Sequence, residues 1–303
     1  MSVNDKVIVV TGSGRGIGRD IALRAAREGA KVVVNDLGVA ADGSGLDATP
    51  AEEVVRLIRE QGGDAVANLD SISEPDSAQR IIDTAIETYG RVDVVINNAG
   101  FLRDRIFHRM SPEEWQAVIH VHLDGYFYVS RAAAPFFKDQ GSGAFVHFTS
   151  PAGLIGSVGQ ANYAAAKMGV VGLSTSIAHD MRRYGVRSNC IAPSAWTRLV
   201  AGIPVADDAA AEKNKHMEQA MGAEKISPLA VFLASDDAAG ITGQIFKVRG
   251  NEVFLMSQPR PIRSVHRDGG WDQSSLRDHM LPALRDSFVP LETHLEHFSW
   301  ETI

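Results

Sequence analysis

Short strand-like runs alternate with stretches of helical period along most of the chain. Seven such runs suit strands of a parallel sheet, several of them buried on both faces; they span residues 6–11, 31–35, 65–69, 92–96, 144–149, 186–192 and 242–249. Between them, stretches such as 19–28 and 75–89 place apolar residues on one side of a helix. The alternation predicts an α/β fold with a single Rossmann-type, doubly wound parallel sheet of about seven strands and helices on both faces. Ligands of such sheets bind in the crevice at the carboxyl ends of the strands.

A glycine cluster directly follows the first run. Gly12, Gly16 and Gly18 lie between a predicted strand and a predicted helix, and Asp36 closes the next strand. Glycines in this context allow a tight turn and a close approach to a pyrophosphate, which the helix N-terminus attracts. A carboxylate at Asp36 would bind ribose hydroxyls and repel a 2′-phosphate. The pattern therefore favours NAD over NADP, although Arg15 in the loop could meet that phosphate.

Three polar residues suited to carbonyl chemistry cluster later in the chain. Tyr163 and Lys167 are four residues apart, which places them on one face of a helix. A nearby ammonium favours the phenolate and lowers the pKa of a tyrosine, so the pair is typical of an acid/base couple. Ser150 lies where the run 144–149 gives way to a loop, and its hydroxyl could hold a substrate oxygen. When only this pair is considered, an ordinary amphipathic helix with a half-buried Tyr163 is the simpler explanation. The other motifs of the chain favour a catalytic pair.

These motifs together resemble those of the short-chain dehydrogenase/reductase family. Residues 11–18 match its Thr-Gly-x3-Gly-x-Gly loop, residues 97–100 its Asn-Asn-Ala-Gly tetrapeptide, and the polar trio its Ser-x12-Tyr-x3-Lys pattern. The resemblance covers about residues 6–250. It implies that Ser150 holds a substrate hydroxyl, that Tyr163 takes its proton, and that Lys167 assists Tyr163 and holds the nicotinamide ribose of the cofactor.

The resemblance also implies the remaining site residues. The expected cofactor contacts are Gly12, Ser13, Arg15, Gly16, Ile17, Gly18, Asp36, Asp70, Ser71, Asn98, Ala99, Gly100, Tyr163, Lys167, Pro193, Ala195 and Thr197. His122 stands where many members carry an asparagine of a proton relay, so it is either a fourth catalytic residue or a structural imidazole. Ser194 replaces a usual glycine, which leaves open the residue that meets the carboxamide. No metal site is expected.

The chain is predicted to form one dehydrogenase domain and an extension. The domain covers residues 1–250 and includes a substrate lid at about 199–224, where a plain surface helix is equally compatible. The helix that carries Tyr163 is rich in small residues, and in this family the equivalent helix forms a dimer interface, so a homodimer or homotetramer is expected. Residues 251–303 contain Trp271 and Trp300 and are too apolar for a disordered tag. This extension is expected to pack on the domain or on a partner subunit.

The net charge and the cysteine count indicate which partners and which compartment to expect. The 303 residues carry a formal charge of −7 with a pI near 5.8, which argues against nucleic acid or an anionic membrane as partner. The single cysteine, Cys190, excludes a disulfide within the chain and suits a reducing compartment. Its apolar context favours a core residue over a nucleophile. With no signal-peptide layout and no apolar run near membrane-spanning length, a cytoplasmic location is expected.

A closer likeness points to a substrate class. Segments 32–38, 61–68, 98–105 and 159–163 resemble the (3R)-hydroxyacyl-CoA dehydrogenase unit of multifunctional enzyme type 2. That likeness implies NAD-dependent oxidation of a (3R)-hydroxyacyl-CoA to a 3-ketoacyl-CoA, in the degradation of fatty acids or steroid side chains. The arginines expected near the site entrance would meet the CoA phosphates or simply form a solvated face; they are Arg103, Arg105 and Arg109.

Two alternatives remain open. The first is a 3-oxoacyl reductase, or a dehydrogenase of steroids or other alcohols, within the same family; lid residues would decide between these substrates. The second belongs to another class, a catalytically idle subunit that binds NAD and serves a partner through its extension. The complete Ser150, Tyr163 and Lys167 set argues against the idle subunit, because such members usually lose one of the three.

Overall fold

One mixed sheet forms the centre of the molecule. The structure, a computed structural model, describes residues 3–38, 45, 48–196 and 219–302. Within these ranges eight strands have the order β3-β2-β1-β4-β5-β6-β7-β8. Their bounds are β1 Val7–Thr11, β2 Lys31–Asn35, β3 Asp64–Asn68, β4 Val94–Asn97, β5 Gly143–Phe148, β6 Val186–Ser194, β7 Ile245–Arg249 and β8 Glu252–Leu255. The first seven pair in parallel, which confirms the predicted sheet. The eighth, antiparallel to β7, was not predicted.

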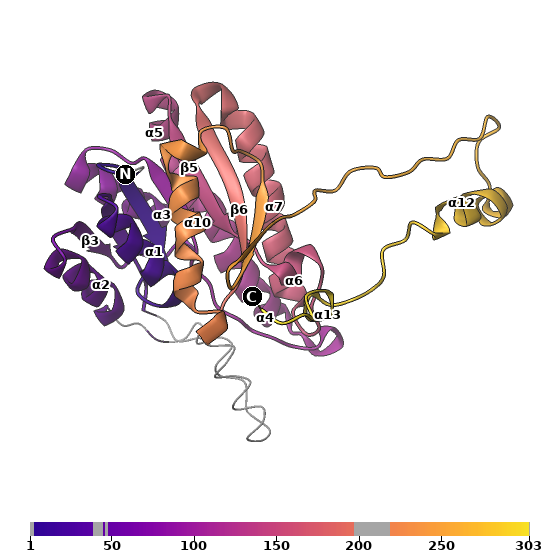
Figure 1. Cartoon of the computed structure of the whole chain (residues 1–303), viewed down its shortest axis with the longest axis horizontal. Coiled ribbons are helices and arrows are strands. Elements are labelled where there is room, and N and C mark those ends of the chain that lie inside the picture. Colours follow the sequence, from indigo (N-terminus) through magenta and orange to yellow (C-terminus); the bar gives the residue numbers. More distant parts are fainter. Residues whose placement is uncertain (1–2, 39–44, 46–47, 197–218, 303) are drawn as a thin grey trace, which may run out of the picture.

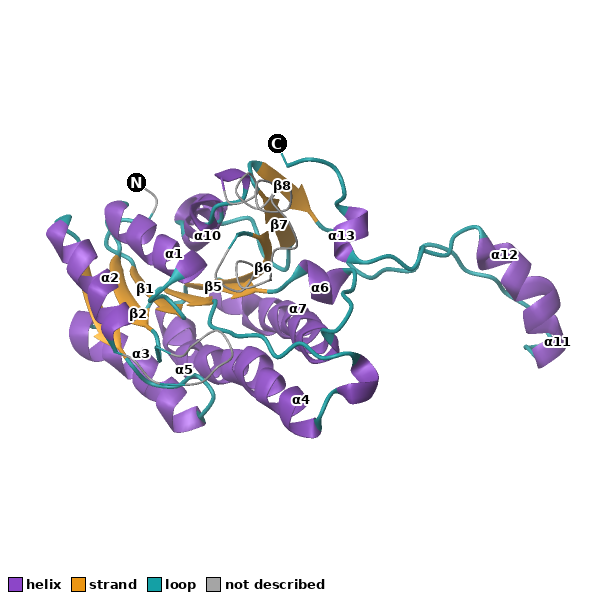
Figure 2. Ribbon diagram, turned by 90° about the horizontal axis from the view of Figure 1, so that it is seen from below, coloured by secondary structure: helices purple, strands orange, loops and turns teal. Residues whose placement is uncertain are grey.

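Helices cover both faces of this sheet (Figures 1 and 2). The longer ones are α1 (Gly16–Arg27), α2 (Thr49–Glu60), α3 (Pro75–Tyr89), α4 (Pro112–Ile119), α5 (Gly125–Gln140), α7 (Ala161–Met181) and α10 (Ser227–Ala234). Short helices are α6 (Pro151–Leu154), α11 (Gln273–Ser275), α12 (Leu281–Arg285) and α13 (His294–His297). Single 3₁₀ turns occupy Phe107–Arg109, Arg182–Tyr184, Ala223–Lys225 and Asp236–Ala238, and π-helical turns occupy His120–Asp124 and Leu276–Met280.

The continuous apolar runs are explained by burial on both faces. Along β1, Ile8 and Val10 join the core under α1, α2 and α10. The alternate residues Val7 and Val9 join the core under α3, α5 and α7. All four side chains are almost completely buried. Because successive side chains of a strand point to opposite faces, a strand with helices on both sides must be apolar at every position.

The strand order reverses at β1, which has β2 on one side and β4 on the other. At such a switch point the connections leave the sheet in opposite directions and open a crevice at the strand carboxyl ends. The glycine loop follows β1 there, residues 97–100 end β4, and Ser150 follows β5. The fold therefore brings the three predicted motifs to one edge of the sheet.

The last part of the chain leaves the body and returns to it. Figures 1 and 2 show α11 and α12 at the far end of a long projection, with α13 back beside the body. Strand β8, at the beginning of the expected extension, is part of the sheet. Residues 197–218, which hold Thr197 and most of the expected lid, lie outside the described residues. No helix in the described ranges is long and apolar enough to cross a membrane.

Candidate active site

The loops after β1 and β4 are tied together by hydrogen bonds. The Thr11 hydroxyl oxygen accepts from the backbone N–H groups of Asn98 (3.1 Å) and Ala99 (3.2 Å). In return, the Asn98 side-chain amide donates to the carbonyls of Thr11 (3.1 Å) and Gly12 (2.9 Å). Asn98 and Ala99 therefore fix the glycine loop in place.

The glycine loop has no room for side chains at two positions. A Cβ atom on Gly12 would lie 2.5 Å from the Ala99 Cα atom, and one on Gly18 only 2.2 Å from the Gly12 carbonyl oxygen. Helix α1 then begins at Gly16, with Arg15 as an N-cap that gives no side-chain capping bond and with no acidic residue in the first turn. Its first amides are thus left for an anion. The loop and helix start fit the pyrophosphate of a dinucleotide.

The predicted ribose-binding carboxylate lies beside this loop. Asp36 accepts from the backbone N–H groups of Gly14 and Gly38, each at 2.7 Å. These bonds hold the carboxylate at the carboxyl end of β2, where the sequence placed it. The Ser13 hydroxyl, by contrast, is buried and donates to the Val10 carbonyl at 2.7 Å.

Two further expected cofactor residues follow β3. The Asp70 carboxylate is engaged by an ion pair with Arg80 at 2.7 Å and a hydrogen bond from Asn68 at 3.0 Å. The Ser71 hydroxyl accepts from the N–H of Ser73 at 3.1 Å. Both side chains are therefore used in local contacts at the end of β3.

Ser150 and Tyr163 meet where β5 ends. The Ser150 hydroxyl caps α6 by accepting from the Ala152 N–H at 3.1 Å, with Pro151 in the first turn, a position that proline favours. The unusual Ser-Pro pair is thus compatible with a fixed hydroxyl. A hydrogen bond between Ser150 and the Tyr163 phenol lowers the pKa of Tyr163, but burial outweighs it and raises that pKa to about 12.

Lys167 is held close to Tyr163 by two hydrogen bonds. Its Nζ donates to the Phe148 carbonyl at 2.7 Å and to the Tyr126 hydroxyl at 3.0 Å, and that hydroxyl donates to the Ala99 carbonyl at 3.1 Å. The ammonium lies 5.7 Å from the Tyr163 ring centre. Burial lowers the pKa of Lys167 to about 7. The expected lowering of the Tyr163 pKa by Lys167 is therefore not found: Lys167 is buried and Tyr163 is partly buried, and desolvation favours the neutral form of each.

His122 belongs to the same cluster. It lies in the π-helical turn between α4 and α5, and its ring meets the Tyr163 ring edge-on with centres 5.1 Å apart. Its Nε2 atom is 2.7 Å from the Phe101 carbonyl and 3.1 Å from the Phe101 N–H, so either neutral tautomer finds a partner there. Among the described residues its buried Nδ1 atom has no hydrogen-bond partner. Burial and the charge of Lys167 hold the pKa of His122 well below its usual range.

Two supporting residues were missed by the sequence reasoning. Tyr126 links Lys167 to the loop after β4, and its position four residues after His122 on a helical stretch was an available signal. Asn162 is fully buried and donates to the carbonyls of Arg103 (3.0 Å) and Glu114 (3.1 Å). Its side-chain oxygen also accepts from the Tyr163 N–H at 2.7 Å. The start of α7 is thereby fixed, and with it Tyr163.

A family model described as "Enoyl-(Acyl carrier protein) reductase" matches residues 12–250. The chain belongs to the short-chain dehydrogenase/reductase family. Members of this family are oxidoreductases that act on CH–OH groups with NAD or NADP. This dehydrogenase/reductase therefore has the same reaction class and uses one of these two cofactors. The expected family is confirmed.

Relatives of this dehydrogenase/reductase include two proteins of Mycobacterium tuberculosis. One is a short-chain type dehydrogenase/reductase, 44% identical over 83% of this chain and 84% of that protein. The other is the hydroxyacyl-CoA dehydrogenase ChsB1, 40% identical over 95% of this chain and 90% of that protein. Mouse peroxisomal multifunctional enzyme type 2 is 38% identical over 86% of this chain, which spans 34% of that longer protein. A crystal structure of a short chain dehydrogenase from Mycobacterium avium is 39% identical, with a TM-score of 0.83 over 97% of this chain and 99% of that one.

Two further expected cofactor residues of this dehydrogenase/reductase lie at the end of β6. Pro193 pairs with β7 inside β6, and Ala195 follows that strand directly. Beside them, Ser194 accepts from the Lys247 ammonium at 2.6 Å. On the substrate side, Arg105 pairs with Gln160 in an isolated bridge next to the start of α7.

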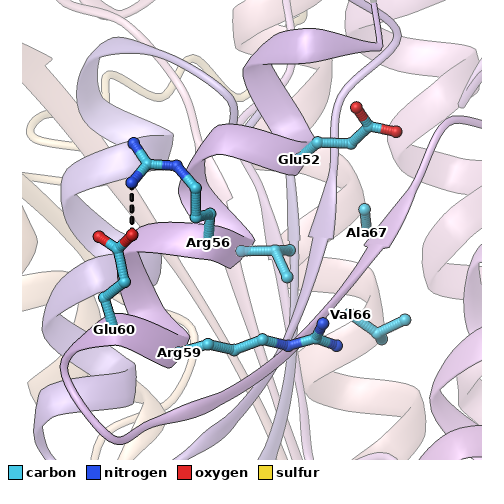
Figure 3. Close-up of a pocket in the computed structure, with 7 residues that line it drawn as sticks. Glu52, Arg56, Arg59, Glu60, Val66 and Ala67 are labelled. Atoms are coloured by element: carbon cyan, nitrogen blue, oxygen red, sulfur yellow. Dashed lines mark hydrogen bonds and ion pairs between the residues drawn. The ribbon is translucent and has the colours of Figure 1, made fainter.

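A separate hollow of about 690 Å³ lies between α2 and β3 (Figure 3). Charged side chains of α2 line it, with Arg56 and Glu60 in an ion pair at 2.6 Å. Strand β3 is at the edge of the sheet, four strand positions from β5. The hollow is therefore not part of the catalytic cluster.

Proposed function

We propose that this dehydrogenase/reductase interconverts a (3R)-hydroxyacyl-CoA and a 3-ketoacyl-CoA with NAD, in the degradation of fatty acids or steroid side chains. The observation that carries the reaction class is the meeting of Ser150, Tyr163 and Lys167 at the carboxyl ends of β4 and β5. The name of the relative ChsB1, a hydroxyacyl-CoA dehydrogenase, supports the acyl-CoA substrate.

Each residue of the cluster has one task in this proposal. Bound nicotinamide supplies the hydride acceptor or donor. Ser150 holds the substrate oxygen, and Tyr163 exchanges the proton with that oxygen. Lys167, when protonated, stabilises the phenolate of Tyr163 and is itself fixed by Tyr126. His122 stays neutral, and its Nδ1 atom, unpartnered among the described residues, would hydrogen-bond a water that carries the proton outward, since either tautomer bonds to Phe101 through Nε2.

The segment 103–109 supports a CoA-sized substrate. It runs beside the start of α7 and is mostly exposed, with Phe107 77% exposed. Arg105 pairs with Glu114 at 2.9 Å, while exposed Arg109 follows in the 3₁₀ turn. Cations and an exposed aromatic ring can meet the phosphates and the adenine of CoA. A solvated basic face remains the alternative for these arginines.

A reductase remains the second candidate. The raised pKa of Tyr163 keeps its phenol protonated at neutral pH, which is the state that donates a proton to a ketone. The matching family model also describes a reductase. Turnover in both directions decides between the two.

The first test is turnover, read from the absorbance of NADH. The panel contains (3R)- and (3S)-hydroxyacyl-CoA, a 3-ketoacyl-CoA with NADH, a steroid alcohol and a simple secondary alcohol. We expect turnover of the (3R) substrate, and a loss of about 10²–10⁴-fold in Tyr163→Phe because the proton-transfer group is removed. Tyr89→Phe, whose hydroxyl bonds Asp64 at the opposite end of β3, is the matched control.

The outcomes separate the candidate functions. Turnover of only the steroid or simple alcohol would contradict the acyl-CoA proposal and keep the reaction class. Full activity in Tyr163→Phe would contradict the assigned role of Tyr163. Silence on every substrate, with NAD still bound, is the result expected of an idle subunit.

The cofactor preference rests on Asp36. A 2′-phosphate would lie against its carboxylate, and like charges in contact cost several kcal/mol. Asp36→Asn removes the charge but keeps an amide oxygen for the loop N–H groups. We expect the ratio of kcat/KM with NADP to that with NAD to rise at least about tenfold. Asp64→Asn, at the start of β3 beside Tyr89, is the control. An unchanged ratio in Asp36→Asn would contradict NAD selection by this residue.

A further inference from the structure

The C-terminal part of the chain forms an arm, residues 259–291, whose two ends are fastened to its own body. Before the arm, the Met256 N–H donates to the Ile245 carbonyl at 2.9 Å, and the Gln258 side chain bonds the Gly243 carbonyl. After the arm, the His294 N–H donates to the Gly156 carbonyl at 3.0 Å. Between these points Figures 1 and 2 both show the arm running away from the body and back.

Apart from a bond from Arg260 to the nearby Gln258, the arm has no hydrogen bond to its own body within the described residues. Its backbone bonds are local, such as Gly270 to Arg267, Leu276 to Asp272 and Phe288 to Arg285. Ordering a residue costs about 1–2 kcal/mol of backbone entropy. Local turns alone do not offset this cost over a segment of such length. A surface outside this copy must therefore supply the stabilising contacts.

The arm exposes large apolar side chains that suit such a surface. Ile262 is 75% exposed, Val289 82% and Leu291 fully, and Trp271, Leu276 and Phe288 are also exposed. The apolar character continues at the root of the arm, where β8 exposes Val253 and Leu255. Solvated linkers are poor in such residues, whereas contiguous exposed apolar surface marks an interaction site.

Charge favours a second copy of this chain as the occupant. Five arginines and four aspartates give the arm a net charge of +1, so with −7 for the whole chain the rest carries −8. The outgoing half is the more basic, with Arg260, Arg263 and Arg267 before the first acidic residue of the arm. A basic, apolar arm thus complements an acidic body. The exposed face of β8 beside the arm can meet its own copy across a two-fold axis, so two arms would be exchanged in a closed arrangement.

We propose that the arm, residues 259–291, clasps the body of a second copy of this chain, and that the second copy clasps the first in the same way. The interface includes the exposed face of β8. It differs from the pairing expected through α7, whose exposed residues Ala165, Met168 and Gly172 lie on another element. The arm interface is independent of the substrate and cofactor proposed above.

Cross-linking between copies tests the proposal directly. Cys190 is buried, so Val289→Cys gives the chain one accessible thiol for a maleimide–benzophenone probe. The probe-bearing variant is prepared once with ordinary nitrogen and once with heavy nitrogen. The two preparations are mixed in equal parts before irradiation. We expect cross-linked peptide pairs that join the arm of one isotope to the body of the other. Thr88→Cys, on the exposed side of α3, is the control and should give no such pairs with the arm. Cross-links confined to single copies, or none at all, would overturn the proposal.

A pair of substitutions gives an independent measurement. The double substitution Val289→Asp and Leu291→Asp introduces two carboxylates at positions that are exposed in the single copy, so folding is preserved. We expect the mass from light scattering to fall by half, with the circular dichroism unchanged. The conservative pair Val289→Ile and Leu291→Met should keep the wild-type mass. An unchanged mass in the aspartate pair, or a wild-type protein of single-chain mass, would overturn the proposal.

Discussion

At the scale of single residues, burial decides the charge of the catalytic pair. Lys167 is 2% exposed, and its only bonds in the described structure go to a carbonyl and a phenol. With no acidic partner there, desolvation dominates and lowers its pKa from 10.5 to about 7. Tyr163 shifts the opposite way, to about 12. Without a cofactor, therefore, Lys167 and Tyr163 are both mostly neutral between about pH 7 and 12.

Lys167 gives a pH dependence of stability with a defined sign. Between pH 7 and 10.5 the unfolded chain keeps the proton on this lysine and the native state loses it. The free energy of unfolding therefore rises with pH in this window, by at most about 1.4 kcal/mol per pH unit, and this contribution is lost as the pH falls toward 7. Lys167→Met should lack this slope, so its stability relative to wild type should be greatest near pH 7 and decline toward pH 10.

Urea unfolding at several pH values measures this slope. Lys138→Met is the control, because that lysine is on α5 at an exposed position and should leave the wild-type slope unchanged. Parallel slopes for wild type and Lys167→Met would contradict a depressed pKa at Lys167.

The site residues that could be predicted are those marked by a fixed spacing in the sequence. Ser150, Tyr163 and Lys167 have a fixed spacing along the chain, and the fold brings them to one edge of the sheet. Tyr126 acts through a hydrogen bond to a lysine 41 residues away, so its helical spacing from His122 hints at the site but does not reveal this bond. The direction of the Tyr163 shift was also missed, because proximity to an ammonium is visible in the sequence and the depth of burial is not.

At the scale of elements, the glycine loop depends on close backbone contact. Gly18, in the first turn of α1, packs against the Gly12 carbonyl with no space for a Cβ atom. Gly18→Ala must push α1 away from the loop. Overpacking of this kind costs about 1–3 kcal/mol. We expect a lower urea midpoint and weaker NADH binding, followed by fluorescence.

Gly240 provides the matched control for this substitution. A Cβ atom there would meet nothing within 4 Å, and its backbone conformation is open to other residues. Gly240→Ala should leave NADH affinity unchanged. Equal affinities of the Gly18 and Gly240 variants would show that the packing of α1 on the loop is not needed for the cofactor.

The helices and strands that could be predicted are those with a clear period of apolar residues. Helix α3 has the predicted bounds of residues 75–89, because its apolar period and the flanking Pro75 and Gly90 all agree. The π-helical turn at His120–Asp124 differs from an ordinary helix only in its hydrogen bonds, which leave no mark in the hydrophobic pattern. Strand β8 is short and follows a tight turn after β7, so nothing separated it from the extension.

At the scale of the whole molecule, the end of the chain packs against β7 and β8. Phe298 packs against the Phe254 and Trp300 rings, with ring centres 5.5 and 5.4 Å away. The Lys247 ammonium, bonded to Ser194 at the end of β6, sits 4.2 Å from the centre of the Phe298 ring. Burial lowers the pKa of Lys247 to about 8. The returning end of the chain thus packs on Lys247, which in turn holds Ser194 at the end of β6.

Removal of the Phe298 ring should loosen this wall without touching the catalytic cluster. Phe298→Ala deletes a half-buried ring and the contact of that ring with the Lys247 ammonium, so we expect a loss of about 1–3 kcal/mol in the free energy of unfolding. The KM for the dinucleotide should rise several-fold, because Ser194 loses its fixed lysine partner, while kcat stays close to wild type. Leu295→Ala, on the exposed side of α13 and 72% exposed, should change neither quantity. A fall in kcat with an unchanged KM would instead mean that the end of the chain acts on Ser150 and Tyr163, through its bond to Gly156.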